Sequence, residues 1–128
     1  MVDKSMRVLV VEDNTTMRRI VVSLVRQLGF NSVDEAGDGT KALEAMKDKK
    51  YGLIVSDWHM APMTGLDLLK NIRTTENPHK MVPFLMVTAE SKPENIIAAK
   101  QAGVSNYIVK PFNAETLKGK LVTIFGQF

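Results

Sequence analysis

The chain contains no cysteine and few aromatic residues, which make up 6% of its 128 residues. Without cysteine it can form neither a disulfide framework nor a thiolate metal site. Its apolar runs all fall short of the about 20 residues that span a bilayer, and the first four residues lack the apolar core of a signal peptide. We therefore exclude the disulfide-rich and membrane classes and expect a cytoplasmic protein.

Positive charge is in slight excess but is nowhere concentrated. The net charge is +3, and the basic residues are scattered, as in Arg18 with Arg19 and Lys118 with Lys120. Scattered charges are typical of solvated helix faces, whereas nucleic-acid surfaces gather them. We expect no nucleic-acid partner, although a mild positive excess favours docking on an acidic protein. The length predicts one domain, residues 1–128, with a core of its own.

The hydrophobic pattern alternates along the chain between continuous apolar runs and helical spacing. Continuous β-branched runs predict strands, and apolar residues three and four apart predict helices. The predicted strands are 7–12, 32–36, 53–57, 82–88 and 105–109, and the predicted helices are 15–28, 40–49, one from Gly65, one from Pro93, and 114–125. This alternation predicts an α/β fold with a parallel sheet and helices on both faces.

Polar side chains stand where the predicted strands end. Glu12 and Asp13 close the first strand, Asp57 closes the third, Thr88 closes the fourth, and Lys110 follows the fifth. Ligands of open parallel sheets bind outside these ends, so we expect all five groups in one crevice. Clustered carboxylates suit a hard divalent cation such as Mg²⁺, which offsets their mutual repulsion.

This set of groups has the chemistry of phosphoryl acceptance. A carboxylate flanked by a metal and an ammonium can attack phosphorus and form an acyl phosphate. We predict that Asp57 is the acceptor, and that Glu12 and Asp13 hold the metal directly or through water. Lys110 then pairs with the phosphoryl group, and Thr88 hydrogen-bonds one of its oxygens. The alternative is that Asp13 and Asp57 only cap the helices that follow them.

At these residues the chain resembles the response-regulator receiver family, and more closely its CheY-like single-domain chemotaxis branch. The resemblance covers essentially the whole chain, and its most specific stretches are Thr16–Val21, Ser56–Trp58, Met86–Glu90, Glu94–Ala99 and Ser105–Phe112. It implies a doubly wound, flavodoxin-like sheet of five parallel strands in the order 2-1-3-4-5. It also implies a cis Lys110–Pro111 peptide and a single receiver domain without an output domain.

The resemblance implies a bacterial signal carrier of a two-component system, active in chemotaxis and flagellar rotation. A CheA-like histidine kinase phosphorylates Asp57, and the receiver catalyses only its own phosphotransfer and autodephosphorylation. The implied ligands of Mg²⁺ are the carboxylates of Glu12, Asp13 and Asp57 and the backbone carbonyl of His59. Thr88 and Tyr107 then switch, and a FliM-like motor switch protein binds the face of the last two helices and fifth strand. A phosphatase is a further partner, and we expect a monomer.

Several positions leave two interpretations open. His59 and Glu90 lie where the family tunes hydrolysis of the acyl phosphate. The His59 imidazole either titrates near neutral pH and controls that lifetime, or is an exposed loop side chain. Tyr107 is either a switch residue or an aromatic edge residue that packs on a helix. Glu12 replaces the commoner Asp, and its extra methylene favours a water-mediated metal contact.

Two other functions remain open. Gly37–Ala42 fits a loosened G-x-G-x-x-A dinucleotide pattern, with Asp57 18 residues past Gly39, although a simple turn and helix start explain the same glycines. The second rival keeps the chemistry but changes the role to a phosphate sink or a regulator of a non-motor target. It is motivated by Ser91, Pro93 and Gly119, which fall on or near the presumed output face.

Overall fold

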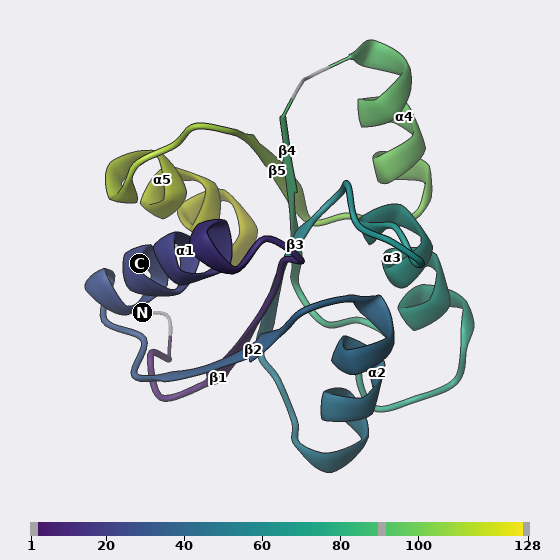
Figure 1. Cartoon of the computed structure of the whole chain (residues 1–128), viewed down its shortest axis with the longest axis horizontal. Coiled ribbons are helices and arrows are strands. Elements are labelled where there is room, and N and C mark those ends of the chain that lie inside the picture. The colour runs from purple at the N-terminus through teal and green to yellow at the C-terminus, as the bar shows by residue number, and fades with distance from the viewer. Residues whose placement is uncertain (1–2, 90–91, 127–128) are drawn as a thin grey trace.

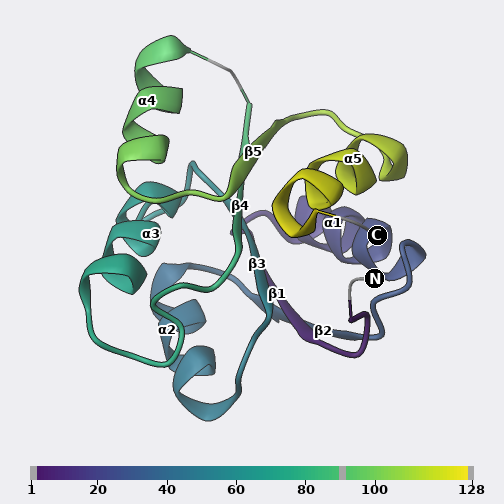
Figure 2. The same ribbon diagram turned by 180° about the vertical axis from the view of Figure 1, so that it is seen from behind.

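The computed structural model describes residues 3–89 and 92–126 and builds one open parallel sheet (Figures 1 and 2). Its strands are β1 (Arg7–Val11), β2 (Ser32–Ala36), β3 (Leu53–Asp57), β4 (Phe84–Thr88) and β5 (Asn106–Val109). They lie in the order β2-β1-β3-β4-β5, and every neighbouring pair is parallel. The predicted fold class and the strand order implied by the resemblance are both confirmed.

The helices cover both faces of this sheet. They are α1 (Thr15–Gln27), α2 (Gly39–Asp48), α3 (Gly65–Thr74), α4 (Pro93–Gln101) and α5 (Ala114–Phe125). Figure 1 shows α1 and α5 together on one face, with α2, α3 and α4 on the other. Both faces of the sheet are covered because the connection from β1 to β2 runs in one direction along the strand order and the later connections run in the other, and right-handed crossovers of opposite direction place their helices on opposite faces.

The core explains why the strands are continuously apolar. In β1, Val8 and Val10 pack into the cluster beneath α1 and α5, whereas Leu9 and Val11 pack into the cluster beneath α2 and α3. Successive strand residues point to opposite faces, so a strand covered on both sides needs an apolar residue at each position. The same reasoning applies to β3 and β4, whose residues are all buried.

The element boundaries differ from the predicted ones by a residue or two, for local reasons. β4 begins at Phe84 where 82 was predicted. Pro83 has no N–H to give to the ladder, although its carbonyl accepts from the Ile54 N–H at 2.9 Å. α2 begins one residue earlier than predicted, because the Asp38 side chain accepts from the Lys41 N–H at 2.8 Å and caps the helix.

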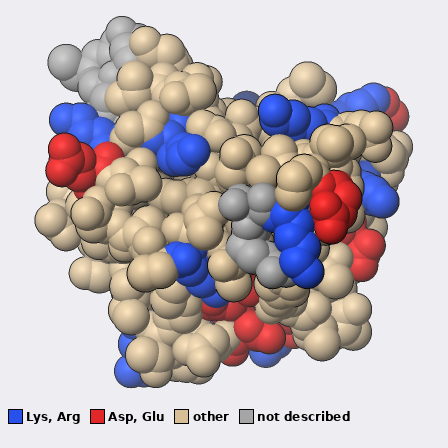
Figure 3. All heavy atoms as spheres, turned by 90° about the horizontal axis from the view of Figure 1, so that it is seen from above, with Lys and Arg blue, Asp and Glu red and all other residues tan. Residues whose placement is uncertain are grey.

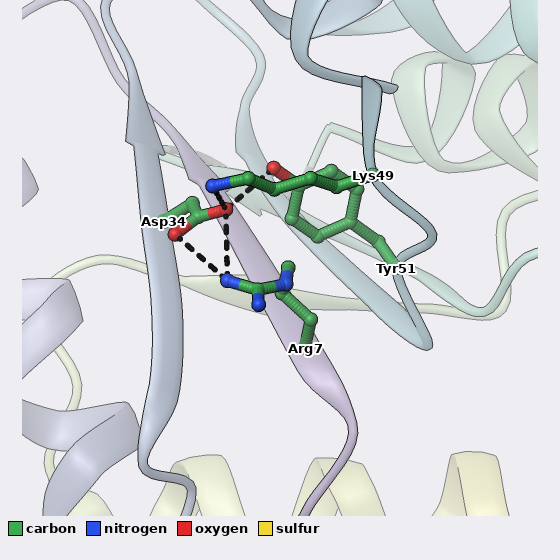
Figure 4. A network of polar contacts seen from close by, with 4 residues as sticks. All are labelled: Arg7, Asp34, Lys49 and Tyr51. Atoms are coloured by element: carbon green, nitrogen blue, oxygen red, sulfur yellow. Dashed lines mark hydrogen bonds and ion pairs between the residues drawn. The ribbon is translucent and has the colours of Figure 1, made fainter. Parts of the chain in front are cut away.

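A network of polar contacts connects side chains at the β2 edge of the sheet (Figure 4). The Asp34 carboxylate of β2 accepts a hydrogen bond from the Tyr51 hydroxyl at 2.7 Å and lies 3.4 Å from the Arg7 guanidinium and 3.5 Å from the Lys49 ammonium. Burial alone would raise the pKa of Asp34, but Tyr51, Lys49 and Arg7 together lower it. The network joins β1 and β2 to the chain that enters β3.

The helices of the described ranges are too short or too polar to cross a membrane.

Candidate functional site

The carboxyl ends of the central strands meet at one edge of the sheet. Val11 pairs with Ser56 in β3, Asp57 pairs with Val87 in β4, and Thr88 pairs with Val109 in β5. The Lys110 N–H continues this pattern and donates to the Thr88 carbonyl at 2.8 Å. The sheet register thus carries the groups that follow these strands to a common edge, where strand order reverses between β1 and β3.

Three carboxylates converge at this edge. Glu12, Asp13 and Asp57 each offer an oxygen within 4.8 Å of the others. The Glu12 and Asp57 residues are buried, at 3% and 4% exposure, whereas Asp13 is exposed. The site is therefore built from two buried acids, with the third on the solvent side.

The Lys110 ammonium bridges the two buried acids. Its Nζ atom lies 2.7 Å from Asp57 Oδ1 and 3.0 Å from Glu12 Oε1. Burial alone would lower the pKa of Lys110, but the contacts with Asp57 and Glu12 outweigh burial and raise it. Lys110 is consequently charged at neutral pH.

The surroundings of Glu12 disfavour the charged form of its carboxyl group. Burial raises the pKa of its carboxyl group, and the charge of Asp57 adds to this, while the hydrogen bond from Lys110 opposes both. One ammonium therefore only partly compensates the acids around it, and negative charge remains in excess.

The residues present fit a divalent cation. Among the described residues, Asp57 Oδ1 is a buried oxygen without a hydrogen-bond partner, and its contact with Lys110 is an ion pair without hydrogen-bond geometry. A buried, under-satisfied carboxylate oxygen beside two further carboxylates offers the hard oxygen ligands that Mg²⁺ prefers. The excess negative charge of the three carboxylates also favours binding of a divalent cation.

Gly65 brings the start of α3 against the site, a contact that the sequence analysis missed. A Cβ at this position would lie 2.2 Å from the Asp57 carbonyl oxygen. The Gly65 N–H also donates to the Trp58 carbonyl at 2.8 Å, which closes the loop after β3. A glycine directly after the helix-capping Thr64 was the available signal.

Neither acid acts as a helix cap. The Asn14 side chain caps α1 by accepting from Met17, and Thr64 caps α3 in a capping box with Asp67. The alternative that Asp13 and Asp57 only cap the following helices is therefore wrong. The carboxylates of Asp13 and Asp57 are part of the group of acids that could hold a metal ion.

The remaining predicted residues lie around this cluster. Thr88 is 5% exposed at the end of β4, and the His59 side chain is exposed in the loop after β3. Tyr107 is half-buried on β5, with the Lys120 ammonium of α5 4.9 Å from its ring centre, which agrees with the packing interpretation. The Lys110–Pro111 peptide is cis, as the resemblance implies. Glu90 lies outside the described residues.

The glycine pattern at residues 37–42 has a structural explanation. Asp38 caps α2, and Gly39 is pressed against Met63, whose Sδ atom would lie 2.7 Å from a Cβ there. A turn, a helix start and close packing account for both glycines. The pattern also follows β2, the edge strand, whereas the strand order reverses between β1 and β3.

Fold and site together define the class of the molecule. It is a doubly wound α/β domain whose switch-point crevice holds clustered carboxylates and an ammonium where nucleotide-binding domains carry a glycine-rich phosphate loop.

Comparisons with known proteins narrow this class to a family. The response regulator receiver domain matches residues 8–122. The chain is 55% identical to chemotaxis protein CheY-3 of Vibrio cholerae over 123 residues, which is 96% of this chain and 94% of the relative. It is 50% identical to chemotaxis protein CheY of Pseudomonas aeruginosa over 120 residues, or 94% of this chain and 96% of that one. The chain belongs to the response regulator receiver family, in its CheY-like chemotaxis branch.

Solved structures agree with this assignment. CheY4 of Vibrio cholerae superposes with a TM-score of 0.86 at 34% identity, covering 93% of this chain and 98% of that one. The receiver domain of a sensor histidine kinase from Pseudomonas aeruginosa PAO1, described with a magnesium ion coordinated in its active site cleft, has a TM-score of 0.83 at 28% identity. It covers 96% of this chain and 99% of its own. The protein is thus a chemotaxis-type response regulator of a two-component system.

Proposed function

We propose that this regulator is switched by phosphorylation of Asp57, with a histidine kinase as donor and Mg²⁺ as cofactor. The observation that carries the proposal is the Asp57 carboxylate, which is buried beside Glu12, Asp13 and Lys110 with one oxygen lacking a hydrogen bond. A buried carboxylate that is paired with a fixed ammonium and lies beside two further acids is arranged to react with an electrophile.

The transfer makes one bond and breaks one. An Asp57 carboxylate oxygen forms a bond to phosphorus while the bond from phosphorus to the donor imidazole nitrogen breaks. The departing imidazole leaves neutral when its other nitrogen carries a proton. Lys110, already charged and within 2.7 Å of Asp57, compensates the phosphoryl oxygens without moving far.

Glu12 and Asp13 complete the site as metal holders. Mg²⁺ supplies charge neutralisation at the phosphoryl oxygens when it is bound. The magnesium described in the cleft of the Pseudomonas aeruginosa receiver domain supports the same use of this chain's acids. Hydrolysis by water returns Asp57 to its carboxylate, and His59 and Glu90, which follow Asp57 and Thr88 by two residues in the sequence, are the residues proposed to tune that step.

Output is proposed at the face formed by α4, β5 and α5. Thr88 at the end of β4 meets the new phosphate, and Tyr107 on β5 responds, which changes the affinity of this face for a FliM-like motor switch protein. Lys120, stacked on Tyr107, connects the switch position to α5. Figure 3 shows the molecule from the upper side of Figure 1, where lysine and arginine side chains are scattered among uncharged and acidic ones.

The first test is phosphorylation by a small donor, acetyl phosphate, with and without Mg²⁺. Trp58 is half-buried next to Asp57, so its fluorescence reports the new charge. We expect a Mg²⁺-dependent change in the wild type and none in Asp57→Asn. If labelled acetyl phosphate transferred its phosphate to the Asp57→Asn protein, the assignment of Asp57 as the acceptor would be contradicted.

A second titration compares NAD with beryllofluoride, which mimics a bound phosphoryl group. Binding of NAD without any response to beryllofluoride would favour the dinucleotide function instead.

The second test separates a motor regulator from a phosphate sink. Ser91 lies outside the described residues, whereas Pro93 begins α4 and Gly119 is exposed on α5, two of the elements of the proposed output face. We expect the phosphorylated protein to bind the N-terminal peptide of the motor switch more tightly than the unphosphorylated protein. Phosphorylation without binding would favour the sink.

We also propose that the protein is a cytoplasmic monomer with one receiver domain, and that a separate phosphatase acts on it.

A further inference from the structure

Arg18 connects the loop that carries the acids to the neighbouring strand. It lies in α1, and its Nη1 atom donates to the Glu12 backbone carbonyl at 2.9 Å. Its Nε atom donates to Glu35 Oε1 at 3.0 Å, on β2. The side chain is only 19% exposed. One guanidinium thus bonds to both β2 and the point where the chain leaves β1.

The geometry of this contact suits arginine and not lysine. Two nitrogens of a planar guanidinium reach two acceptors in a fixed arrangement, whereas an ammonium is a point charge on a flexible stem. The guanidinium also lies against the turn after β2, since a Cβ at Gly37 would be 3.6 Å from Nη1. The arginine therefore fits a prepared position between two loops at the edge of the site.

The acid-bearing loop is held at both of its ends. Asn14 fixes its far end, because its side chain accepts from Met17 and its carbonyl accepts from the Arg18 N–H at 2.8 Å. The Arg18 side chain fixes its near end at Glu12. Asp13 lies between these two anchors, so its backbone is held on both sides.

We propose that Arg18 is a positioning residue for the metal site. By holding the Glu12 carbonyl, it keeps the Glu12 and Asp13 carboxylates close enough to Asp57 to share one cation. This inference rests on the function proposed above. Groups that orient metal ligands in this way commonly change metal affinity by about 10–100-fold when they are removed.

Electrostatics gives the opposite expectation, which makes the proposal testable. Arg18 is a cation close to a cation site, so loss of its charge alone would tighten Mg²⁺ binding. Loss of its positioning role would weaken binding. Arg19 is the matched control, because it is the next residue of α1, carries the same charge and is exposed.

The experiment is a Mg²⁺ titration followed by Trp58 fluorescence, without any phosphodonor. We expect Arg18→Met to weaken Mg²⁺ binding about tenfold. Arg19→Met should leave binding unchanged or slightly tighter. Arg18→Lys, which keeps the charge but loses the fork, should lie between the wild type and Arg18→Met, and it decides the question if Arg18→Met does not fold.

Two further readouts separate positioning from a loss of overall structure. Thermal unfolding without Mg²⁺ should differ little between the Arg18 and Arg19 variants. Phosphorylation of Arg18→Met by acetyl phosphate should be slow at limiting Mg²⁺ and return to the wild-type rate at saturating Mg²⁺. Equal Mg²⁺ affinity in Arg18→Met and Arg19→Met overturns the role of Arg18 and leaves the proposed function intact. Failure of the wild type to bind Mg²⁺ overturns both.

Discussion

At the scale of single residues, Lys110 sets the charge balance of the site. It is the cation that the two buried acids share, at 2.7 Å from Asp57 and 3.0 Å from Glu12. Its raised pKa keeps it charged at neutral pH. Its two proposed effects have opposite signs, because a fixed ammonium repels a metal ion but attracts a phosphoryl group.

Replacement of Lys110 should separate metal binding from phosphoryl transfer. In Lys110→Met we expect Mg²⁺ to bind at least as tightly as in the wild type, since a competing cation is gone. Phosphorylation by acetyl phosphate should slow by about 10²–10³-fold, because the developing charge loses its fixed partner. Trp58 fluorescence measures the first effect and a phosphate label the second.

Lys70→Met is the control for this prediction. It removes the same charge from an exposed position on α3 and should change neither measurement. Weaker Mg²⁺ binding with normal phosphorylation in Lys110→Met would contradict the role given to its ammonium.

At the scale of elements, the helices differ in how firmly they are anchored. α3 buries Gly65, Leu68, Leu69 and Ile72, whereas α4 buries Ala99 alone. α4 also begins without a side-chain cap, since its N-cap residue, Lys92, makes no capping hydrogen bond. Elements with few buried contacts open most easily, so the proposed output face contains the most weakly held helix while α3 is fixed beside Asp57.

Gly65 should be required for the packing of α3 against the site. In Gly65→Ala the new methyl group meets the rigid Asp57 carbonyl at 2.2 Å, so α3 or the end of β3 must move. We expect a loss of about 1–3 kcal/mol in the free energy of unfolding and weaker Mg²⁺ binding. Urea unfolding and Trp58 fluorescence measure the two effects.

Gly39→Ala is the matched comparison, because there the new methyl group meets the side chain of Met63 at 2.7 Å. An unbranched thioether can move aside, so its cost should be smaller. Equal losses in Gly39→Ala and Gly65→Ala would show that backbone contact at Asp57 is not decisive.

Gly119 and Gly126 should respond to the same substitution with opposite signs. Gly119 lies in the middle of α5, and a Cβ there meets no described atom within 4 Å. Gly119→Ala should stabilise the protein by about 0.4–1 kcal/mol. Gly126 ends α5 with φ at +80°, so Gly126→Ala should destabilise it by about 1–2 kcal/mol. Thermal unfolding checks both, and a loss of stability in Gly119→Ala would contradict the reading of α5 as a regular helix there.

At the scale of the whole molecule, a buried histidine links folding to pH. His79 is 4% exposed, and its Nε2 atom accepts a hydrogen bond from the Tyr51 N–H at 2.9 Å. A protonated ring could not accept this bond. Burial lowers the pKa of His79, and the charge of Lys50 lowers it further. The folded protein therefore prefers the neutral ring, which joins the loop before β4 to the segment just before β3.

The free energy of unfolding should consequently contain a contribution from His79 that is lost in acid. Above its ordinary pKa of 6.5 the ring is neutral in both states, and this contribution is complete. Below that pH, His79 of the unfolded chain binds a proton more readily than His79 of the folded chain. The free energy of unfolding therefore falls as pH falls. In His79→Gln, whose amide oxygen can accept the same hydrogen bond, urea unfolding between about pH 8 and 5.5 should show a shallower decline.

His59→Gln is the control, because it removes the other, exposed histidine. It should keep the wild-type pH dependence of stability. Identical pH profiles for His79→Gln and the wild type would contradict the role of the buried ring.

Much of this fold could be predicted because its signals are local. The apolar run of Val8 to Val11 and the helical spacing of α1 are both properties of a few neighbouring residues, and the structure follows them within one or two residues. Errors arose where a single atom decides a boundary, as with the missing N–H of Pro83. The alternative that Asp13 caps α1 failed because Asn14, the next residue, is an equally good capping residue, and the backbone conformation gives the cap to Asn14.

The sequence by itself determined a parallel α/β sheet with acids, Thr88 and Lys110 at its strand ends, because strand and helix periods and the rule for parallel sheets need no distant information. Only the tertiary structure decided that Lys110 bridges Glu12 and Asp57, and that Gly65 lies against the Asp57 carbonyl. These contacts join residues far apart in the chain, and their geometry depends on sheet register and helix packing.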